Sequence, residues 1–519
     1  MSTSIAPSTP TRPRAGNVDR FWLPALAGVA AALAALGLAE LTAALLAPTA
    51  SPVLAVGALV IDFVPNGVKD LVISLFGTAD KAVLIITLGL VVLALAALAG
   101  VLEYRRAPWG RVLVAAISAV ALLAALTRSG SAAFDAVPSL VAAGAGTIVL
   151  TVLVRRLGRT FEGEGALNRR GFLAYTGVSA GVGLLALIGG QFLLAGTRAA
   201  DAARAFFTLP PASVPGVPIP AGATLDVAGL TPIITPNRDF YRIDTALQVP
   251  RIDPSTWRLR ITGMVENEVE ISFAELLALP LEESTTTLAC VSNYVGGDLI
   301  GNAVWLGYPI RKLLERAGPT GGADMVLSTS SDGFTAGTPI EALTDERNAI
   351  LAVGMNGEPL PLEHGYPARM VVPGLYGYVS ATKWVVELKL TRFDREQGYW
   401  TPRGWSELGP VKLSSRIDVP RSGVPAGPVV VAGVAWSQHV GIRAVQVQID
   451  DGAWNDATLA DAISVDTWRQ WMYTWPATAG NHTVRVRATD AEGLVQTSAT
   501  QNVAPDGATG LHQISVSVA

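Results

Sequence analysis

Long apolar runs, separated by short polar or arginine-containing segments, fill roughly the first 200 residues of the chain. Most of these runs are close to the ~20 residues that an α-helix needs to cross the hydrocarbon core of a bilayer. A further apolar stretch at residues 52–76 is interrupted by charged residues, asparagine, proline and glycine, so we expect an external loop or an interfacial helical pair there. The pattern predicts five membrane spans, at residues 21–46, 82–102, 112–126, 137–154 and 171–194.

Arginine residues are concentrated in three of the polar segments: before the first span, between the second and third, and between the fourth and fifth. They are Arg12, Arg14, Arg20, Arg105, Arg106, Arg111, Arg155, Arg156, Arg159, Arg169 and Arg170. The positive-inside rule therefore predicts a cytoplasmic N-terminus. An odd number of spans then places everything after the fifth span outside the cytoplasmic membrane.

The fifth span has an unusual entry, NRRGFLAYTGVSAGVGLLALIGG, which begins at Asn168. The arginine pair followed by an apolar run rich in glycine and alanine resembles a twin-arginine export signal placed inside the chain. Ordinary cytoplasmic charges that anchor a helix give the same pattern. An export signal of this kind would carry the following domain across the membrane already folded.

The pattern changes in the second part of the chain. Strand-like segments alternate with short helical ones up to about residue 393, which predicts a mixed α+β domain. Near the C-terminus, alternating apolar and polar positions with Asp-Gly and Glu-Gly turn signals predict a β-sandwich. The expected organisation is an all-α transmembrane region at residues 1–196, a Pro/Ala-rich linker at 197–223, the α+β domain at 224–393, a connector at 394–411 and the sandwich at 412–519.

The composition supports a membrane protein that does not bind nucleic acid. Half of the residues are hydrophobic, only 15% are charged, and the mean hydropathy is +0.40. The formal net charge of −4, with no basic cluster outside the borders of the apolar runs, argues against nucleic acid as a partner. The lipid bilayer is the partner that this composition predicts.

The single cysteine, Cys290, lies in the stretch TTTLACVSNYVGG, where a strand-like run meets a glycine-rich loop. One cysteine makes no intrachain disulfide, no zinc knuckle and no four-thiolate iron–sulfur site. Taken alone, it is most simply a small buried hydrophobic residue. The surrounding motifs change that interpretation.

Five segments accompany Cys290: TPNRDFYRIDT before it, then WLGYPIRKLL, SDGFTAGTPIEAL, MNGEPLPLEHGYPARMVVPGLYGYVSATKW and DREQGYWTPRGW. Together they resemble the sulfite oxidase family of molybdenum enzymes, including its bacterial membrane-associated and methionine-sulfoxide-reductase-like branches. The closing VAGVAWSQHVGIRAVQVQIDDGAW is similar to that family's C-terminal immunoglobulin-like domain, which mediates dimers in some relatives, so the resemblance allows a homodimer. The resemblance to the family as a whole extends from about residue 223 to residue 504.

The resemblance implies that the Cys290 thiolate binds molybdenum beside the two sulfurs of a pyranopterin, the molybdopterin cofactor. A soft thiolate suits such a sulfur-rich metal centre. Arg242 would orient an anionic or polar substrate, while Phe334 and Thr335 would shape the pocket. The cofactor-binding residues that the resemblance implies are Asn237, Phe240, Tyr241, Arg242, Asn293, His364, Arg369, Gly377, Tyr378, Ser380 and Lys383. The residues alone also allow two simpler roles: Tyr378 could be a core residue, and Arg369 could be a surface cation at the end of a strand.

The sequence departs from the sulfite-oxidising pattern around the substrate. Phe334 stands where those members have a tyrosine, and Asp244 stands where the family usually has a histidine. In the sulfite-oxidising members, arginines surround the substrate anion. Two of those arginine positions align here with Val295 and with either His439 or Val440. Each missing charge-assisted hydrogen bond removes roughly 1.5–3 kcal/mol of binding free energy. The sequence therefore favours an S-oxide or another oxo compound over sulfite as the substrate.

Oxygen-atom transfer changes the metal by two electrons, so we expect an external electron carrier, such as a cytochrome or a quinone-linked protein. The chain has no CxxCH motif, and its four histidines all follow residue 363, so we expect no haem and no iron–sulfur cluster. The leading interpretation is a membrane-anchored enzyme that acts on a small molecule outside the cytoplasmic membrane. The alternative is a non-catalytic, membrane-anchored binding or scaffold protein with a degenerate cofactor pocket.

Overall fold

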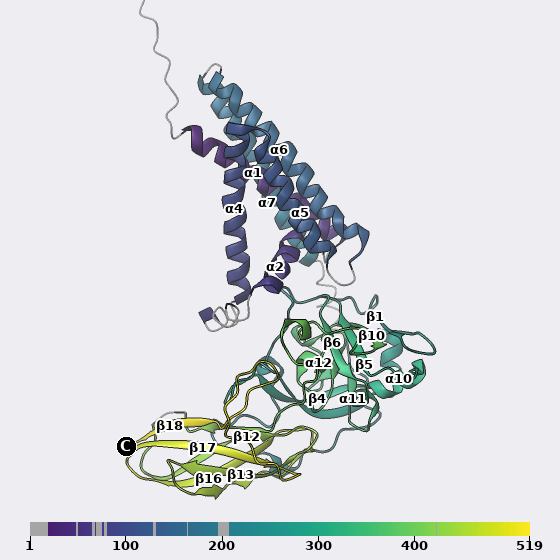
Figure 1. Cartoon of the computed structure of the whole chain (residues 1–519), viewed down its shortest axis with the longest axis vertical. Helices are drawn as coiled ribbons and strands as arrows, with labels where there is room; N and C mark the ends of the chain where they lie inside the picture. Colours follow the sequence, from purple (N-terminus) through teal and green to yellow (C-terminus); the bar gives the residue numbers. More distant parts are fainter. Residues whose placement is uncertain are drawn as a thin grey trace, which may run out of the picture. The chain divides into compact units, whose positions relative to one another are not determined.

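The computed structural model describes residues 19–47, 50–64, 68, 75–76, 80–127, 131–162, 165–195, 207–421 and 423–519. Figure 1 shows their course. The chain divides into two compact units, residues 1–197 and 198–519, which are considered separately. Arg12, Arg14 and the first ten residues of the predicted linker lie outside the described residues, and so does most of the segment between residues 65 and 79.

Among its described residues, the first unit has five helices that are long and apolar enough to cross a membrane. Their number and order match the five predicted spans, although the helices extend beyond the apolar runs. Within this unit α1 contacts α4, α6 and α7. A Cβ atom at Gly37 would clash with the backbone of Gly183, so small residues let α1 and α7 approach closely. The five helices are α1 (Asp19–Leu46), α4 (Asp80–Arg106), α5 (Trp109–Leu126), α6 (Val137–Glu162) and α7 (Gly165–Ala195).

The interrupted apolar stretch begins as a separate helix, α2 (Pro52–Phe63). Its 12 residues are too few to cross a bilayer. The side chain of Ser51 caps the first turn by accepting a hydrogen bond from Leu54 N–H, and proline occupies the first helical position. The described part of this stretch therefore agrees with the prediction that it is not a sixth span.

Two five-stranded sheets form the framework of the second unit up to residue 391. One has the order β2-β1-β10-β5-β6; the other has the order β3-β4-β7-β8, with β9 paired to β7. The first sheet consists of β1 (Arg258–Gly263), β2 (Val269–Ser272), β5 (Met325–Ser330), β6 (Thr335–Pro339) and β10 (Val385–Thr391). The second consists of β3 (Glu282–Ala289), β4 (Ile300–Pro309), β7 (Ile350–Met355), β8 (Glu358–Pro359) and β9 (Arg369–Val371). These elements confirm the predicted mixed α+β domain.

Capping residues delimit two short helices of this domain. Ser272 and Glu275 form a reciprocal capping box at the start of α9 (Phe273–Leu277). The next helix, α10 (Ile310–Ala317), ends at Gly318, whose φ of 67° is costly for residues with a Cβ atom. The buried face of α10 joins the main hydrophobic core through Ile310, Leu313, Leu314 and Ala317. The remaining short helices are α11 (Glu341–Thr344) and α12 (Gly377–Ser380).

The C-terminal part contains two four-stranded antiparallel sheets, which share one hydrophobic cluster. Their orders are β11-β12-β16-β15 and β14-β13-β17-β18, and Figure 1 shows them in yellow-green. Trp471 is fully buried in the common cluster. The strands are β11 (Ser414–Val419), β12 (Gly427–Trp436), β13 (Ile442–Ile449), β14 (Trp454–Asp456), β15 (Thr458–Leu459), β16 (Arg469–Ala477), β17 (Gly480–Asp490) and β18 (Gln513–Val518). The predicted sheets are present, and their immunoglobulin-like relationship stays a prediction.

A buried polar network ties this C-terminal part to strand β3. The hydroxyl of Thr287 donates to Asn302 Oδ1 (2.9 Å) and accepts from the backbone N–H of Trp468 (2.8 Å). Both Asn302 Nδ2 and the Trp468 indole N–H donate to the carbonyl of Ile233, at 2.8 and 2.9 Å. A buried polar group left without its partner costs about 1–3 kcal/mol. The network therefore fixes β3 near its end, at Thr287, three residues before Cys290.

Candidate active site

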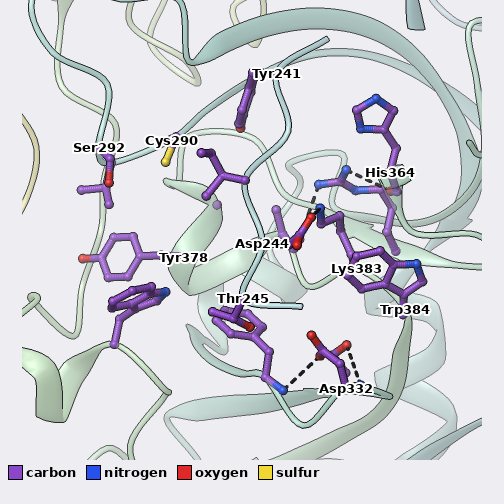
Figure 2. A pocket seen from close by; sticks show the side chains of 18 of the residues that line it. Tyr241, Asp244, Thr245, Cys290, Ser292, Asp332, His364, Tyr378, Lys383 and Trp384 are labelled. Carbon is purple, nitrogen blue, oxygen red and sulfur yellow. Dashed lines mark hydrogen bonds and ion pairs between the residues drawn. The ribbon is translucent and has the colours of Figure 1, made fainter. Parts of the chain in front are cut away.

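A cavity of about 140 Å³ opens beside the end of β3. Figure 2 shows Cys290, Ser292 and Tyr378 on one side of it and Asp244, Lys383 and His364 on the other. The lining residues come from loops and strand ends spread over more than 160 positions of the sequence. They are Phe240, Tyr241, Ile243, Asp244, Thr245, Cys290, Val291, Ser292, Ser330, Asp332, Phe334, His364, Arg369, Gly377, Tyr378, Ala381, Lys383, Trp384, Trp400 and Trp405.

Cys290 is held at the cavity wall by its backbone. Its N–H donates to Leu299 O at 2.9 Å, and its carbonyl accepts from Asn293 N–H at 3.1 Å. Burial raises the pKa of the thiol, whereas hydrogen bonds from the backbone and side chain of Ser292 partly oppose that shift by favouring the thiolate. Cys290 is therefore a buried thiol that faces a cavity and has donors beside its sulfur.

Arg369, the first residue of β9, is a buried cation that no carboxylate pairs with among the described residues. It is 5% exposed, and its guanidinium donates to the backbone carbonyls of His364 (3.1 Å), Met370 (3.3 Å) and Ala381 (3.4 Å). Burial lowers its pKa to about 10. Because a buried charge is costly unless it is compensated, this side chain favours an anionic ligand in the cavity.

Asp244 bridges two cations with a single oxygen. Its Oδ2 lies 2.9 Å from Arg242 Nε and 2.8 Å from Lys383 Nζ, and its side chain is only 4% exposed. Lys383 also donates to the carbonyl of Glu363 at 3.0 Å. Burial lowers the pKa of Lys383 to about 8, and Asp244 partly opposes the shift. Asp244 thus supplies the negative charge for the cations at this edge of the cavity.

His364 is a neutral imidazole in this site. Burial, followed by the nearby Arg369 and Lys383 charges, lowers its pKa to about 4. Its Nε2 lies 3.1 Å from the carbonyl of Asn237, which can only accept, so we assign the proton to Nε2 and leave Nδ1 as an acceptor. Phe240 packs edge-on against the ring, with centroids 5.6 Å apart, and this contact fixes its orientation.

Most of the site residues predicted from the sequence come together at this cavity. Arg369 is buried at the cavity wall and is not a surface cation; Tyr378 lines the wall and also packs against the hydrophobic core. The predicted residues found in the wall are Cys290, Phe240, Tyr241, Phe334, His364, Arg369, Gly377, Tyr378 and Lys383.

The other predicted residues lie behind the wall. Asn237 donates to the carbonyl of Met355 at 3.3 Å, and Asn293 accepts from Leu299 N–H at 2.9 Å. The Ser380 hydroxyl donates to Tyr376 O at 2.9 Å, while the Thr335 carbonyl accepts from Tyr399 N–H at 2.9 Å. These contacts, together with the Arg242–Asp244 ion pair, support the loops that form the wall. In the structure these residues therefore support the wall instead of lining it.

Several residues in the wall were not predicted. Ser292 lies within the cysteine motif, two positions after Cys290, and Trp400 and Trp405 lie within the DREQGYWTPRGW motif. Asp332 belongs to the SDGF segment that was singled out for Phe334. The motifs were informative, but only the folded chain shows which of their side chains reach the cavity.

The wall fits the group that the sequence resemblance implies. It offers a soft sulfur ligand in Cys290, a buried guanidinium suited to a phosphate and an acceptor nitrogen on His364. The uncompensated charge of Arg369 is the strongest of these observations, because it calls for an anion.

We expect the pKa of Cys290 to be measurable by alkylation, since the chain has a single thiol. In the cofactor-free full chain in detergent, maleimide labelling should be slow at pH 7 and should still accelerate above pH 9. Ser292→Ala should slow labelling at a fixed pH by about three- to tenfold, because losing a hydrogen bond to the thiolate raises the pKa further. The exposed Ser255→Ala change is the control. Equal rates in the two variants would contradict the role of Ser292.

Comparisons with known proteins place the site in a family. Residues 246–400 match the model of the oxidoreductase molybdopterin binding domain. The chain is 33% identical over 157 residues to an uncharacterised oxidoreductase, YuiH, of Bacillus subtilis. This alignment covers 30% of this chain and 76% of that protein. It is 29% identical over 314 residues to sulfite oxidase of Gallus gallus (51% of this chain, 68% of that protein).

Two further similarities are more partial. Mitochondrial sulfite oxidase of Homo sapiens is 29% identical over 304 residues, which span 49% of this chain and only 55% of that protein. The solved structure of the sulfane dehydrogenase SoxCD from Paracoccus pantotrophus is similar over 57% of this chain and 82% of that chain, with 24% identity and a TM-score of 0.48. From the family model and the sequence relatives, the chain belongs to the sulfite oxidase family of molybdopterin-dependent oxidoreductases and is an enzyme of that family.

Proposed function

We propose that the protein is a membrane-anchored oxidoreductase that uses molybdopterin to transfer an oxygen atom to or from a small substrate other than sulfite, such as an S-oxide. The observation that carries the proposal is the Cys290 thiol in the same cavity wall as the buried, uncompensated guanidinium of Arg369. Family membership supplies the cofactor class and the enzymatic character, so the scaffold alternative loses its support.

The side chains have separate tasks in this proposal. Cys290 would ligate the metal, and Arg369 would neutralise the anionic part of the cofactor. His364 would accept a hydrogen bond through Nδ1, because its lowered pKa keeps that nitrogen unprotonated at neutral pH. The bound cofactor supplies the two-electron oxygen-atom chemistry, while these residues hold and orient it.

The charges in the cavity argue against a sulfite substrate. The cations near its edge, Arg242 and Lys383, are both paired with Asp244, and Arg369 would be engaged by the cofactor. Phe334, in the place of a tyrosine, offers no hydrogen bond. An anion would therefore meet an apolar ring and a carboxylate, so we expect an uncharged or cationic oxo compound to be the better substrate.

Replacing the proposed metal ligand provides the main test. Cys290→Ser should reduce bound molybdenum, measured by mass spectrometry of the purified full chain, and should reduce S-oxide reduction by more than about a hundredfold, since even weaker outer-sphere changes cost 10–100-fold. Ser255→Ala should retain both. A Cys290→Ser variant with full metal content and activity would disprove the assignment.

Asp244 offers a test of anion exclusion. In Asp244→Asn, Arg242 and Lys383 lose their shared counterion, so we expect sulfate to bind about tenfold more tightly, a change of about 1.4 kcal/mol. Calorimetry should be done at pH 6, because removing the carboxylate lowers the pKa of Lys383 below about 8. Asp239→Asn, which removes an exposed carboxylate outside the cavity, is the matched control. Unchanged sulfate affinity in Asp244→Asn would count against this account of specificity.

We place the enzyme domain outside the cytoplasmic membrane, with electrons exchanged through a separate cytochrome or quinone-linked protein. The positions of the arginines support this orientation, including Arg105 and Arg106 in the last turn of α4. The twin-arginine interpretation concerns Arg169 and Arg170 near the start of α7; the side chain of Arg169 lies outside the described residues. That the protein has no haem and no iron–sulfur cluster stays a prediction. That it forms a homodimer also stays a prediction.

Protease digestion of right-side-out membrane vesicles tests the orientation. We expect the unit after residue 197 to be cut in these vesicles and protected in inverted ones. Changing Arg169 and Arg170 together to lysine keeps the positive charge, so a domain that becomes protected would support a twin-arginine signal. A domain still cut in this variant would refute that signal alone, whereas wild-type protection in right-side-out vesicles would refute the orientation.

A further inference from the structure

The cavity wall includes a continuous cluster of aromatic rings. Tyr378 and Trp405 have ring centroids 5.9 Å apart, and Trp405 and Trp400 have centroids 6.1 Å apart. Phe334 joins the cluster through Tyr399, 5.8 Å from it, and Tyr399 lies 5.1 Å from Trp400. Phe334, Tyr378, Trp400 and Trp405 all line the cavity and are only partly buried.

One ring of the cluster is fixed by a hydrogen bond. The phenol of Tyr378 donates to the carbonyl of Ser406 at 2.7 Å, which fixes its ring beside Trp405. Tyr399, which belongs to the cluster but does not line the cavity, already stacks against a cation, because the guanidinium carbon of Arg403 lies 3.8 Å from its ring centroid. Aromatic faces attract cations within about 6 Å through their quadrupole. The rings of the wall therefore form a preorganised surface of the kind that binds organic cations.

A carboxylate accompanies the rings. Asp332 lines the same cavity, and its Oδ1 accepts the N–H of Phe334 at 3.2 Å, which places this carboxylate at the edge of the aromatic cluster. Asp332 therefore places a carboxylate next to the Phe334 end of the aromatic cluster, which favours a cation over an anion there.

We infer that Phe334, Tyr378, Trp400, Trp405 and Asp332 form a substrate subsite for a positively charged, methyl-substituted ammonium or sulfonium group. This inference rests on the proposed function and narrows its substrate class to oxo compounds that carry such a group. The aromatic faces contact the methyl groups, and Asp332 complements the charge. The subsite shares one cavity with Cys290, so one small molecule bound there reaches toward the metal-ligand side of the wall.

A matched pair of ligands separates charge recognition from simple apolar binding. Choline and 3,3-dimethylbutan-1-ol have the same shape, but only choline carries a positive charge. In calorimetric titrations of the cofactor-loaded full chain in detergent, we expect choline to bind about tenfold more tightly than the alcohol. Choline should also inhibit S-oxide reduction competitively, whereas the alcohol should not at the same concentration.

Two variants assign the binding to this subsite. Asp332→Asn should weaken choline binding several-fold and leave the alcohol unchanged, and Trp405→Leu should weaken both ligands. Asp394→Asn, an exposed carboxylate paired with Arg392 outside the cavity, is the matched control and should change neither.

Equal affinity for the two ligands, no binding of choline, or choline binding that is insensitive to Asp332→Asn would each overturn the inference. A chain that reduces S-oxides without recognising choline would refute the subsite and leave the proposed function standing. Choline binding by a chain that transfers no oxygen atom would refute the proposed function and leave the cation site standing.

Discussion

The buried charge of Arg369 is the constraint on which the site depends. Its guanidinium donates to three backbone carbonyls and lies 5.1 Å from the ring centroid of Trp305, but no carboxylate pairs with it among the described residues; burial lowers its pKa to about 10. The same charge helps to keep His364 neutral. Burying a cation in this way lowers the stability of the folded chain unless an anion binds beside it. An anionic group bound beside Arg369 would therefore stabilise this part of the fold, as any ligand does that binds only the native state.

The position of the thiol depends on contacts made far along the chain. Thr287 and Asn302 connect adjacent strands to the backbone of Trp468, and the apolar cluster around Ala289 and Val291 includes residues of the C-terminal sheets. The C-terminal part thus takes part in fixing the strand that presents Cys290. Its physical contribution to the site is rigidity, whatever else it does in an assembly.

The cavity wall combines two kinds of chemistry. Arg369, Lys383 and His364 suit an anionic, hydrogen-bonding group. The aromatic rings and Asp332 suit an organic cation. Asp244 lies among the cations and neutralises two of them. This combination underlies the proposal that the substrate is an oxo compound other than sulfite.

The sequence by itself determined the long apolar helices, the alternation of short helices and strands, and the family, because these depend on local apolar periodicity and short motifs. It identified Cys290, His364 and Arg369 because each lies within such a motif. It did not determine that Arg242 and Lys383 share one carboxylate oxygen, or that Trp400, Trp405 and Asp332 enter the same wall as Ser292. Those facts were decided by the tertiary structure, since burial, charge pairing and ring contacts arise between residues that are distant in sequence and meet only when the sheets pack.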